Sequence, residues 1–129
     1  MQRALDAAIE RAVRRVALDL VYILTSPPSA GGTPIDTGWA RSNWLINIGR
    51  PAPSPVGSRS SVQPLAPAIG PLLGYRVRNG SVYVTNNVPY IVLLNDGSSR
   101  QAPSAFVQRG IDRAVAGASG GGVSVRRTQ

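Results

Sequence analysis

The sequence predicts an α+β fold: a long N-terminal amphipathic helix and a C-terminal helix packed on a small antiparallel β-sheet, with a long Pro-rich loop. Three patterns predict it. Apolar residues recur with helical spacing over residues 2–25, strand periodicity appears over 40–48 and 75–84, and prolines crowd residues 51–71. Residues 1–116 are expected to form one α+β domain in which 50–71 is a loop or arm, and 117–129 a flexible C-terminal tail.

The composition limits the possible functions. The 129 residues include no cysteine and no histidine, which removes disulfides, His-based triads and almost every transition-metal site. No apolar run approaches the roughly 18–20 residues of a membrane-spanning helix, and the N-terminus lacks a signal peptide's apolar stretch. All 14 basic residues are arginine, and the formal charge is +8. Such an excess favours anionic partners, although arginine can also simply supply charge to a solvated face.

An apolar stripe predicts the N-terminal helix. The stripe consists of Leu5, Ile9, Val13, Val16, Leu20, Ile23 and Leu24. Charged residues fall largely on the other side, and Ser26-Pro27-Pro28 ends the helix. Ordering a helix costs about 1.5 kcal/mol per residue, so this one must dock on something. The stripe is expected to face the core, and a contact of part of it with another subunit is the alternative.

Two alternating regions are predicted to form the sheet. The first has a buried face made of Ala40, Ser42, Trp44, Ile46 and Ile48, with Arg41, Asn43 and Asn47 between them. In the second, Asn79-Gly80 separates two alternating runs, and Asn-Gly is the preferred two-residue hairpin turn. That hairpin pairs Arg78 with Ser81 and Val77 with Val82. It places Tyr75, Val77, Val82 and Val84 in the core and Arg76, Arg78, Ser81 and Tyr83 on the other face.

The remaining segments are loops and a final helix. The Pro-rich residues 50–71 are either a disordered linker or an arm that becomes ordered against a neighbouring subunit. Residues 91–94 are too few for periodicity to distinguish helix from strand. Pro103, at a first helical position, is predicted to open the last helix, whose apolar face is Phe106, Val107, Ile111 and Val115.

Asp36-Thr37-Gly38 is the tripeptide of aspartic peptidases, in which two such carboxylates share one proton. The surrounding residues do not fit that chemistry. The aspartate follows Thr33-Pro34-Ile35 in place of an apolar strand, and Trp39 stands where a small residue is needed. No Gly-rich phosphate loop and no other acid–base set is present, so we expect no enzyme and no cofactor.

Three motifs, in this order, carry a family resemblance. They are Thr33-Pro34-Ile35-Asp36-Thr37-Gly38 with Arg41-Ser42-Asn43-Trp44, then Val82-Tyr83-Val84-Thr85-Asn86-Asn87-Val88-Pro89-Tyr90, then Leu94-Asn95-Asp96-Gly97-Ser98-Ser99-Arg100-Gln101-Ala102-Pro103. Over residues 5–116 the chain resembles the neck or tail-completion (minor tail) proteins of tailed double-stranded-DNA bacteriophages. It departs from them at Asn95, where the family usually has glutamate, and at Ser104-Ala105, where a glycine is common.

The resemblance implies a structural virion protein and no catalysis. It implies a homo-oligomeric ring, six- or twelve-fold, at the head–tail junction, in contact with neck, stopper, terminator or tail-tube proteins, formed in the host cytoplasm and without a membrane. The motif residues that carry it are Asp36, Thr37, Gly38, Trp44, Asn86, Asn87, Pro89, Tyr90, Gly97, Ser99, Gln101 and Pro103. Passing contact with channel DNA is a further expectation.

Charge suggests which residues make the contacts. Arginine is enriched at protein interfaces, and the arginines are spread along the chain, which favours protein neighbours over DNA. The predicted inter-subunit contacts are Arg50, Arg59, Arg76, Arg78 and Arg100. The alternatives are a tail terminator or head-side stopper and, more distantly, a basic nucleic-acid-binding domain that uses Arg76, Arg78 and Tyr83.

Overall fold

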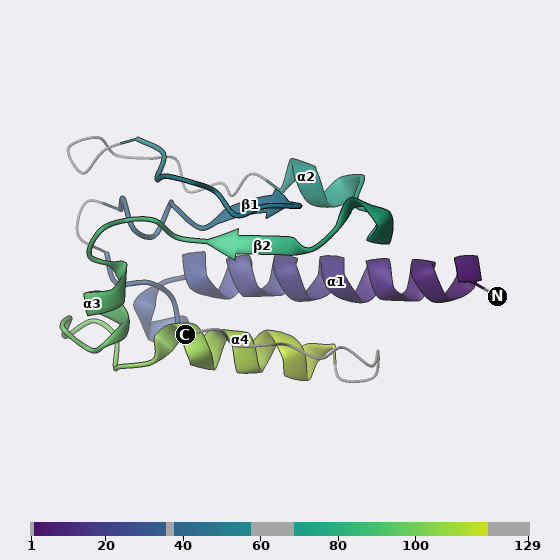
Figure 1. Ribbon diagram of the computed structural model, residues 1–129. Helices are drawn as coiled ribbons and strands as arrows, with labels where there is room; N and C mark the ends of the chain where they lie inside the picture. The colour runs from purple at the N-terminus through teal and green to yellow at the C-terminus, as the bar shows by residue number, and fades with distance from the viewer. Residues whose placement is uncertain (1, 36–37, 58–68, 119–129) are drawn as a thin grey trace.

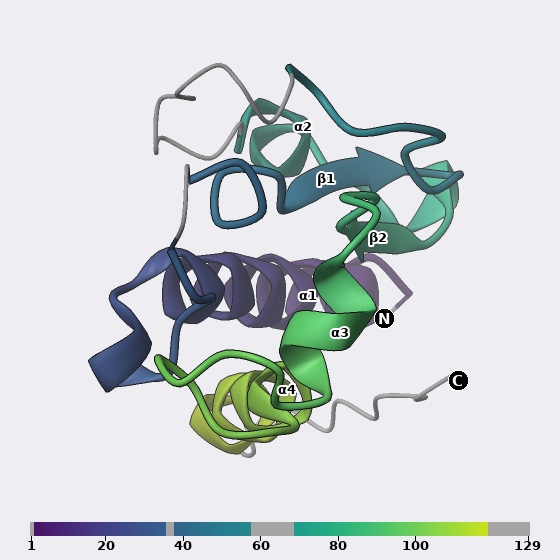
Figure 2. The ribbon, with the colours of Figure 1, turned by 90° about the vertical axis from the view of Figure 1, so that its left-hand side faces the viewer.

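The computed structural model describes residues 2–35, 38–57 and 69–118. In chain order the elements are α1 (Gln2–Thr25), the 3-10 turn η1 (Pro28–Ala30), β1 (Leu45–Ile48), α2 (Gly70–Leu73), the 3-10 turn η2 (Val77–Asn79), β2 (Val82–Thr85), α3 (Ile91–Asn95) and α4 (Phe106–Gly117). The helix α1 lies between the two-stranded sheet and α4, as Figures 1 and 2 show from two sides. The predicted α+β fold, with a long N-terminal helix, a C-terminal helix and a small antiparallel sheet, is confirmed.

The helix α1 has the predicted bounds, but its apolar stripe is only partly buried. Near its C-terminal end Val21 is 1% exposed and Leu24 0%, whereas Leu5 is 56% and Ile9 40% exposed. The cause is the shorter length of α4, whose last residue, Gly117, lies beside Asp19. The prediction that the whole stripe faces the core is therefore wrong for the first turns of α1.

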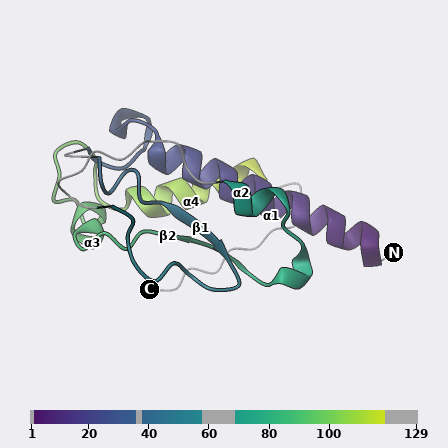
Figure 3. The same ribbon diagram turned by 90° about the horizontal axis from the view of Figure 1, so that it is seen from above.

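The sheet pairs β1 with β2, not the two halves of an Asn-Gly hairpin. The strands are antiparallel, with Leu45 opposite Thr85 and Ile48 opposite Val82, and they run nearly along α1 (Figure 3). The predicted hairpin is wrong because η2 uses its backbone groups elsewhere. Arg76 bonds Asn79 through both its N–H and its carbonyl, which a hairpin would pair with Tyr83, and the Gly49 N–H takes the Ser81 carbonyl that a hairpin assigns to Arg78. The Val77 N–H in turn donates to the buried Glu10 carboxylate over 2.9 Å.

The consequence is that the predicted arginine–tyrosine face does not form. Tyr83 lies in β2 opposite Asn47. Arg76 precedes η2 and Arg78 lies within it, so both arginines are outside the sheet. Tyr75 is nevertheless buried, at 4% exposure, and its hydroxyl donates to the Gly80 carbonyl over 3.0 Å.

The strand β1 begins later than predicted, at Leu45. The preceding residues form a turn in which the Ser42 N–H donates to the Gly38 carbonyl over 3.0 Å. This turn directs Asn43 inward, to 1% exposure, where the alternating pattern had predicted an outward side chain. Ala40, Trp44 and Ile46 are buried as predicted.

The core lies where the sheet, α1, α2 and the start of α4 meet. Its cluster of buried residues consists of Ala17, Val21, Leu24, Trp44, Ile46, Leu72, Ala102 and Phe106. A two-stranded sheet is marginal alone, so packing on α1 is what makes it stable. The buried positions of α4 are Phe106, Gly110 and Ala114, and a Cβ at Gly110 would lie 3.2 Å from Leu24 Cδ2. Small residues thus let α4 approach α1 closely.

The helix α4 begins at Phe106, three residues after the predicted start at Pro103. Its N-cap residue, Ala105, has a φ of 63° and no side chain that can accept a hydrogen bond. The capping acceptor comes instead from the last residue of α3: Asn95 Oδ1 accepts the Val107 N–H over 3.0 Å. A side chain of the preceding helix therefore replaces the missing local cap.

Several predictions fall on residues beyond those described. Asp36, Thr37 and Arg59 lie outside the described residues, as do most of the predicted arm and residues 119–129 of the predicted tail. Of the parts described, Gly117 belongs to α4, and α2 forms at the C-terminal end of the Pro-rich segment. The ambiguous run at 91–94 is helical, in α3.

Candidate functional site

The described parts of the segments 33–38, 86–90 and 95–103 meet at one end of the molecule, on the left in Figure 1, which we call the motif end. Gln101 joins two of them. Its Nε2 donates to the Ile35 carbonyl over 2.7 Å, and its Oε1 accepts the Ile35 N–H over 2.8 Å. The Ser99 hydroxyl in turn accepts the Gln101 N–H over 3.1 Å. The side chain of Gln101 thus pairs with Ile35 as a neighbouring strand would.

Asparagine side chains hold the other loops of the motif end. Asn86 Nδ2 donates to the Ala40 carbonyl over 2.8 Å, and Asn87 Nδ2 donates to the Ala52 carbonyl over 2.7 Å. The Asn43 side chain bonds both backbone groups of Val56, near the end of the described part of the arm. Its Oδ1 accepts the Val56 N–H over 2.7 Å, and its Nδ2 donates to the Val56 carbonyl over 3.0 Å. An amide offers donors and an acceptor together, which suits irregular backbone.

Trp44 is fixed by a buried hydroxyl. Thr33 is 0% exposed; its Oγ1 donates to the Leu24 carbonyl over 2.7 Å and accepts from Trp44 Nε1 over 2.8 Å. This chain of bonds ties the end of α1 to the start of β1. Trp44 therefore has a structural role in the core.

A pocket of about 170 Å³ lies at the motif end. Its lining residues are Pro34, Ile35, Ala40, Tyr90, Leu94, Ser99 and Gln101. Trp39 meets Tyr90 edge-on, with ring centroids 6.0 Å apart. The structure thus brings together the predicted residues Tyr90, Ser99 and Gln101, and the lining offers no acid–base pair.

The remaining motif residues shape the loops. Gly38 and Gly97 have φ values of 87° and 95°, in the left-handed region that favours glycine. Pro89 and Pro103 are exposed, in the segments that lead into α3 and α4. All four positions therefore act on the course of the backbone.

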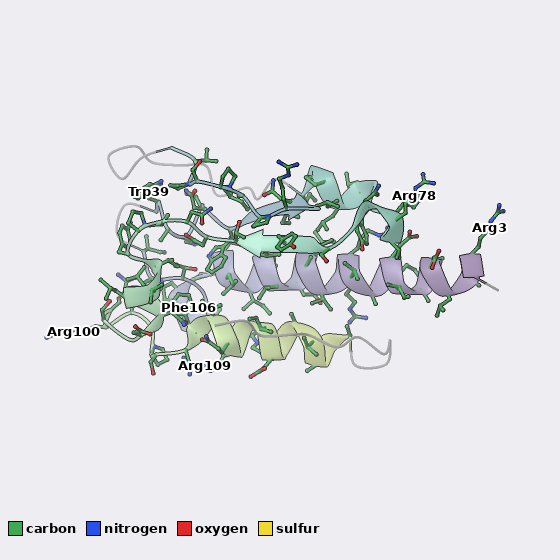
Figure 4. The ribbon with its side chains drawn as sticks, in the orientation of Figure 1. Arg3, Trp39, Arg78, Arg100, Phe106 and Arg109 are labelled. Atoms are coloured by element: carbon green, nitrogen blue, oxygen red, sulfur yellow. The ribbon has the colours of Figure 1, made fainter. Side chains whose placement is uncertain are left out.

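The predicted contact arginines do not form one patch. Arg76 and Arg78 line a hollow of about 340 Å³ together with Arg3, Asp6 and Glu10, and we call this group of five the arginine end. Figure 4 shows Arg3 and Arg78 at the end of the molecule opposite to Trp39 and Arg100. Arg50 is exposed and follows Gly49, whose N–H donates to the Ser81 carbonyl over 2.8 Å.

Among residues 2–35, 38–57 and 69–118, no group of three or more acidic residues is placed to hold a metal ion. The helices of the described segments include none long and apolar enough to cross a membrane.

Comparisons with family models, curated proteins and solved structures return no match to this chain. The resemblance stated above therefore depends on the motifs themselves, whose described residues the fold places together.

Sequence reasoning did not identify the amide side chains of Asn43 and Asn95 as structural clamps, nor Arg109 and Arg113 as a pair. Asn95 left a signal in the sequence, because it stands in a polar segment without periodicity, whereas Asn43 is hidden in the alternating pattern of residues 40–48. Arg109 and Arg113 are spaced by four within α4, which places both on one side of that helix.

Proposed function

We propose that the protein is a structural subunit of the bacteriophage neck, a tail-completion or head–tail joining protein that assembles in a ring. The order of the three motifs along the chain supports this proposal. Hydrogen bonds from Gln101 and Asn86 join the described parts of these motifs into one unit. The tail terminator and the head-side stopper are the alternative positions in the same assembly.

The observation that carries the proposal is the exposure of large apolar side chains in two unlike places. Leu5 and Ile9 are 56% and 40% exposed on the first turns of α1, and Val92 and Leu93 are 66% and 60% exposed on α3. These two groups lie toward opposite ends of the molecule (Figure 1). Exposed apolar side chains at both ends suit a subunit that contacts neighbours on two sides, and a closed ring needs two different surfaces on each subunit.

The arginine end supplies the charged part of a contact in this proposal. Arg76 and Arg78 are exposed, and the hollow that they line also includes the half-buried Asp6 and the buried Glu10. A surface that mixes both signs suits the mixed surface of a protein better than the uniform negative charge of DNA.

The test is electron microscopy of lysates from a phage that carries a nonsense mutation in this gene. DNA-filled heads beside separate tails of normal length are expected. Tails of abnormal length would assign the protein to the terminator, and intact infectious particles would overturn the neck assignment. Tight DNA binding by the isolated protein, steeply weakened by salt, would favour the nucleic-acid-binding alternative.

A further inference from the structure

A hollow of about 230 Å³ lies between η1 and the beginning of α4, apart from the arginine end and from the pocket of the motif end. Its apolar lining comes from Pro28, Ala102, Pro103 and Phe106, and its charged lining from Arg109 and Arg113. Phe106 is 2% and Ala102 4% exposed, whereas both arginines are exposed. The hollow therefore has an apolar floor and two guanidinium groups at its mouth. Figure 4 shows Phe106 and Arg109 at the start of α4.

Both arginines are held by carbonyl groups of the surrounding loops. Arg113 Nη1 donates to the Ala30 carbonyl over 2.9 Å, and Arg109 Nη2 donates to the Pro103 carbonyl over 3.3 Å. A guanidinium has five N–H donors, so each of these bonds leaves donors for a ligand. Holding the side chains in place also lowers the entropy that binding would otherwise cost.

A glycine makes room for one of the two arginines. Gly31 has a φ of 98°, and a Cβ added to it would lie 2.7 Å from Arg113 Nη1. The guanidinium thus occupies space that a side chain at this position would take. The end of η1 and the second turn of α4 therefore fit each other around the mouth of the hollow.

We propose that this hollow binds an acidic segment of a protein partner, in which an aliphatic or aromatic side chain stands next to an aspartate or glutamate. The apolar side chain would cover Phe106 and Ala102, where burial of apolar area is favourable. The neighbouring carboxylate would accept hydrogen bonds from Arg109 and Arg113, since guanidinium forks match carboxylates. Small-molecule and cofactor sites usually exceed about 300 Å³, so the hollow fits a single side chain better.

The same lining argues against nucleic acid at this place. DNA affinity comes mainly from many phosphate contacts along a basic surface. Two guanidinium groups over an apolar floor offer few such contacts, and the floor contributes nothing to a phosphate. The proposal requires neither a ring nor a phage, so it stands or falls independently of the proposed function.

The test titrates the ¹⁵N-labelled full chain with two peptides that differ in one group, acetyl-Ser-Phe-Asp-Ser-amide and acetyl-Ser-Phe-Asn-Ser-amide. We expect the acidic peptide to bind about tenfold more tightly in low salt, because only it has a carboxylate for the arginines. The amide signals of Phe106, Gly110 and Arg113 should shift most. Equal affinity for both peptides, or shifts centred on another surface, would overturn the proposal.

Variants locate the effect at the mouth of the hollow. Arg109→Gln and Arg113→Gln should each weaken the acidic peptide several-fold and leave the neutral peptide unchanged. Arg11→Gln is the matched control, because it removes the same charge from an exposed position of α1. An equal loss of affinity for the acidic peptide in this control would show a general charge effect and overturn the site. A short DNA duplex that shifts the same amide signals more strongly than the acidic peptide would also overturn it. The wild-type peptide pair decides the question if either variant folds poorly.

Discussion

The motif end and the arginine end differ in how far their polar side chains are bonded within the chain and how far they are exposed to solvent. At the motif end the side chains of Gln101, Asn86 and Asn87 donate hydrogen bonds to backbone carbonyls of distant segments. At the arginine end Glu10 and Arg76 also bond the backbone, at Val77 and Tyr75, but Arg3, Arg76 and Arg78 are exposed around a hollow. The difference teaches that the residues which carry the family resemblance maintain the fold, while the exposed arginines remain available to a partner.

The largest effect is expected where the chain enters the motif end. A Cβ at Gly32 would lie 1.6 Å from the Ser26 carbonyl oxygen, a backbone atom that cannot rotate away. Gly32→Ala should lower the free energy of unfolding by about 3 kcal/mol or more, because the backbone itself must move. Thermal or urea unfolding measures this.

Gly74→Ala is the matched control, because a Cβ there would meet nothing within 4 Å. It should change stability by no more than about 0.5 kcal/mol. Equal stability of the two variants would contradict the tight crossing at Gly32.

The second prediction removes an amide clamp. Asn43→Ala leaves the Val56 N–H without the partner that it has in the structure, while the Val56 carbonyl keeps its bond from Trp39 Nε1. We expect a loss of about 1–3 kcal/mol, the cost of one unmade hydrogen bond and of the buried amide that made it. Urea unfolding measures it, with Asn47→Ala, half-buried on the strand β1 that follows, as control. A loss as large at Asn47 would remove the distinction between clamp and ordinary strand residue.

The third prediction concerns the start of α4. Asn95→Ala should cost about 1–2 kcal/mol, the usual cost of losing an N-cap acceptor. Ala105→Gly should have the opposite sign and stabilise the protein by about 1 kcal/mol, because glycine adopts the positive φ of 63° without strain. Calorimetry on both variants checks the signs, and a destabilised Ala105→Gly would mean that the left-handed cap is absent in solution.

The smallest effect on stability is expected at the arginine end. Arg78→Gln changes an exposed side chain of η2 and should alter the free energy of unfolding by less than about 0.5 kcal/mol. In a complementation assay, however, we expect it to lower the phage titre, if the proposed contact is right. Arg15→Gln, another exposed arginine, serves as control, since its ion pair with Asp19 is a surface pair of little energetic value. Full titre with Arg78→Gln would exclude this residue from the contact.

Elements with long periodic patterns were predictable from the sequence, and elements set by distant contacts were not. The helix α1 was predicted with its bounds because seven apolar positions repeat along it. The Asn79-Gly80 hairpin failed because Gly49, 32 positions before Ser81, takes the Ser81 carbonyl that the hairpin assigns to Arg78. A dipeptide signal cannot reveal such a competitor.

The candidate site shows the same division. The motif order singled out three segments, and the described parts of these segments meet at one end of the molecule. The direction of Asn43 and the cap from Asn95 depend on tertiary structure, because the same amide side chain serves equally well in a solvated loop. The contact arginines were predicted together from their charge, yet Arg78 and Arg100 lie at opposite ends of the molecule. The charge of a residue does not indicate where the fold places it.

The pairing of Gln101 with Ile35 has a consequence for the order in which the chain folds. The two residues stand 66 positions apart, so this contact closes only after residue 101 has left the ribosome. Until then Ile35 offers both backbone groups to any passing strand, as an uncovered sheet edge does. Gln101 therefore covers these two backbone groups late in folding, and we expect a chain truncated before Gln101 to aggregate more readily.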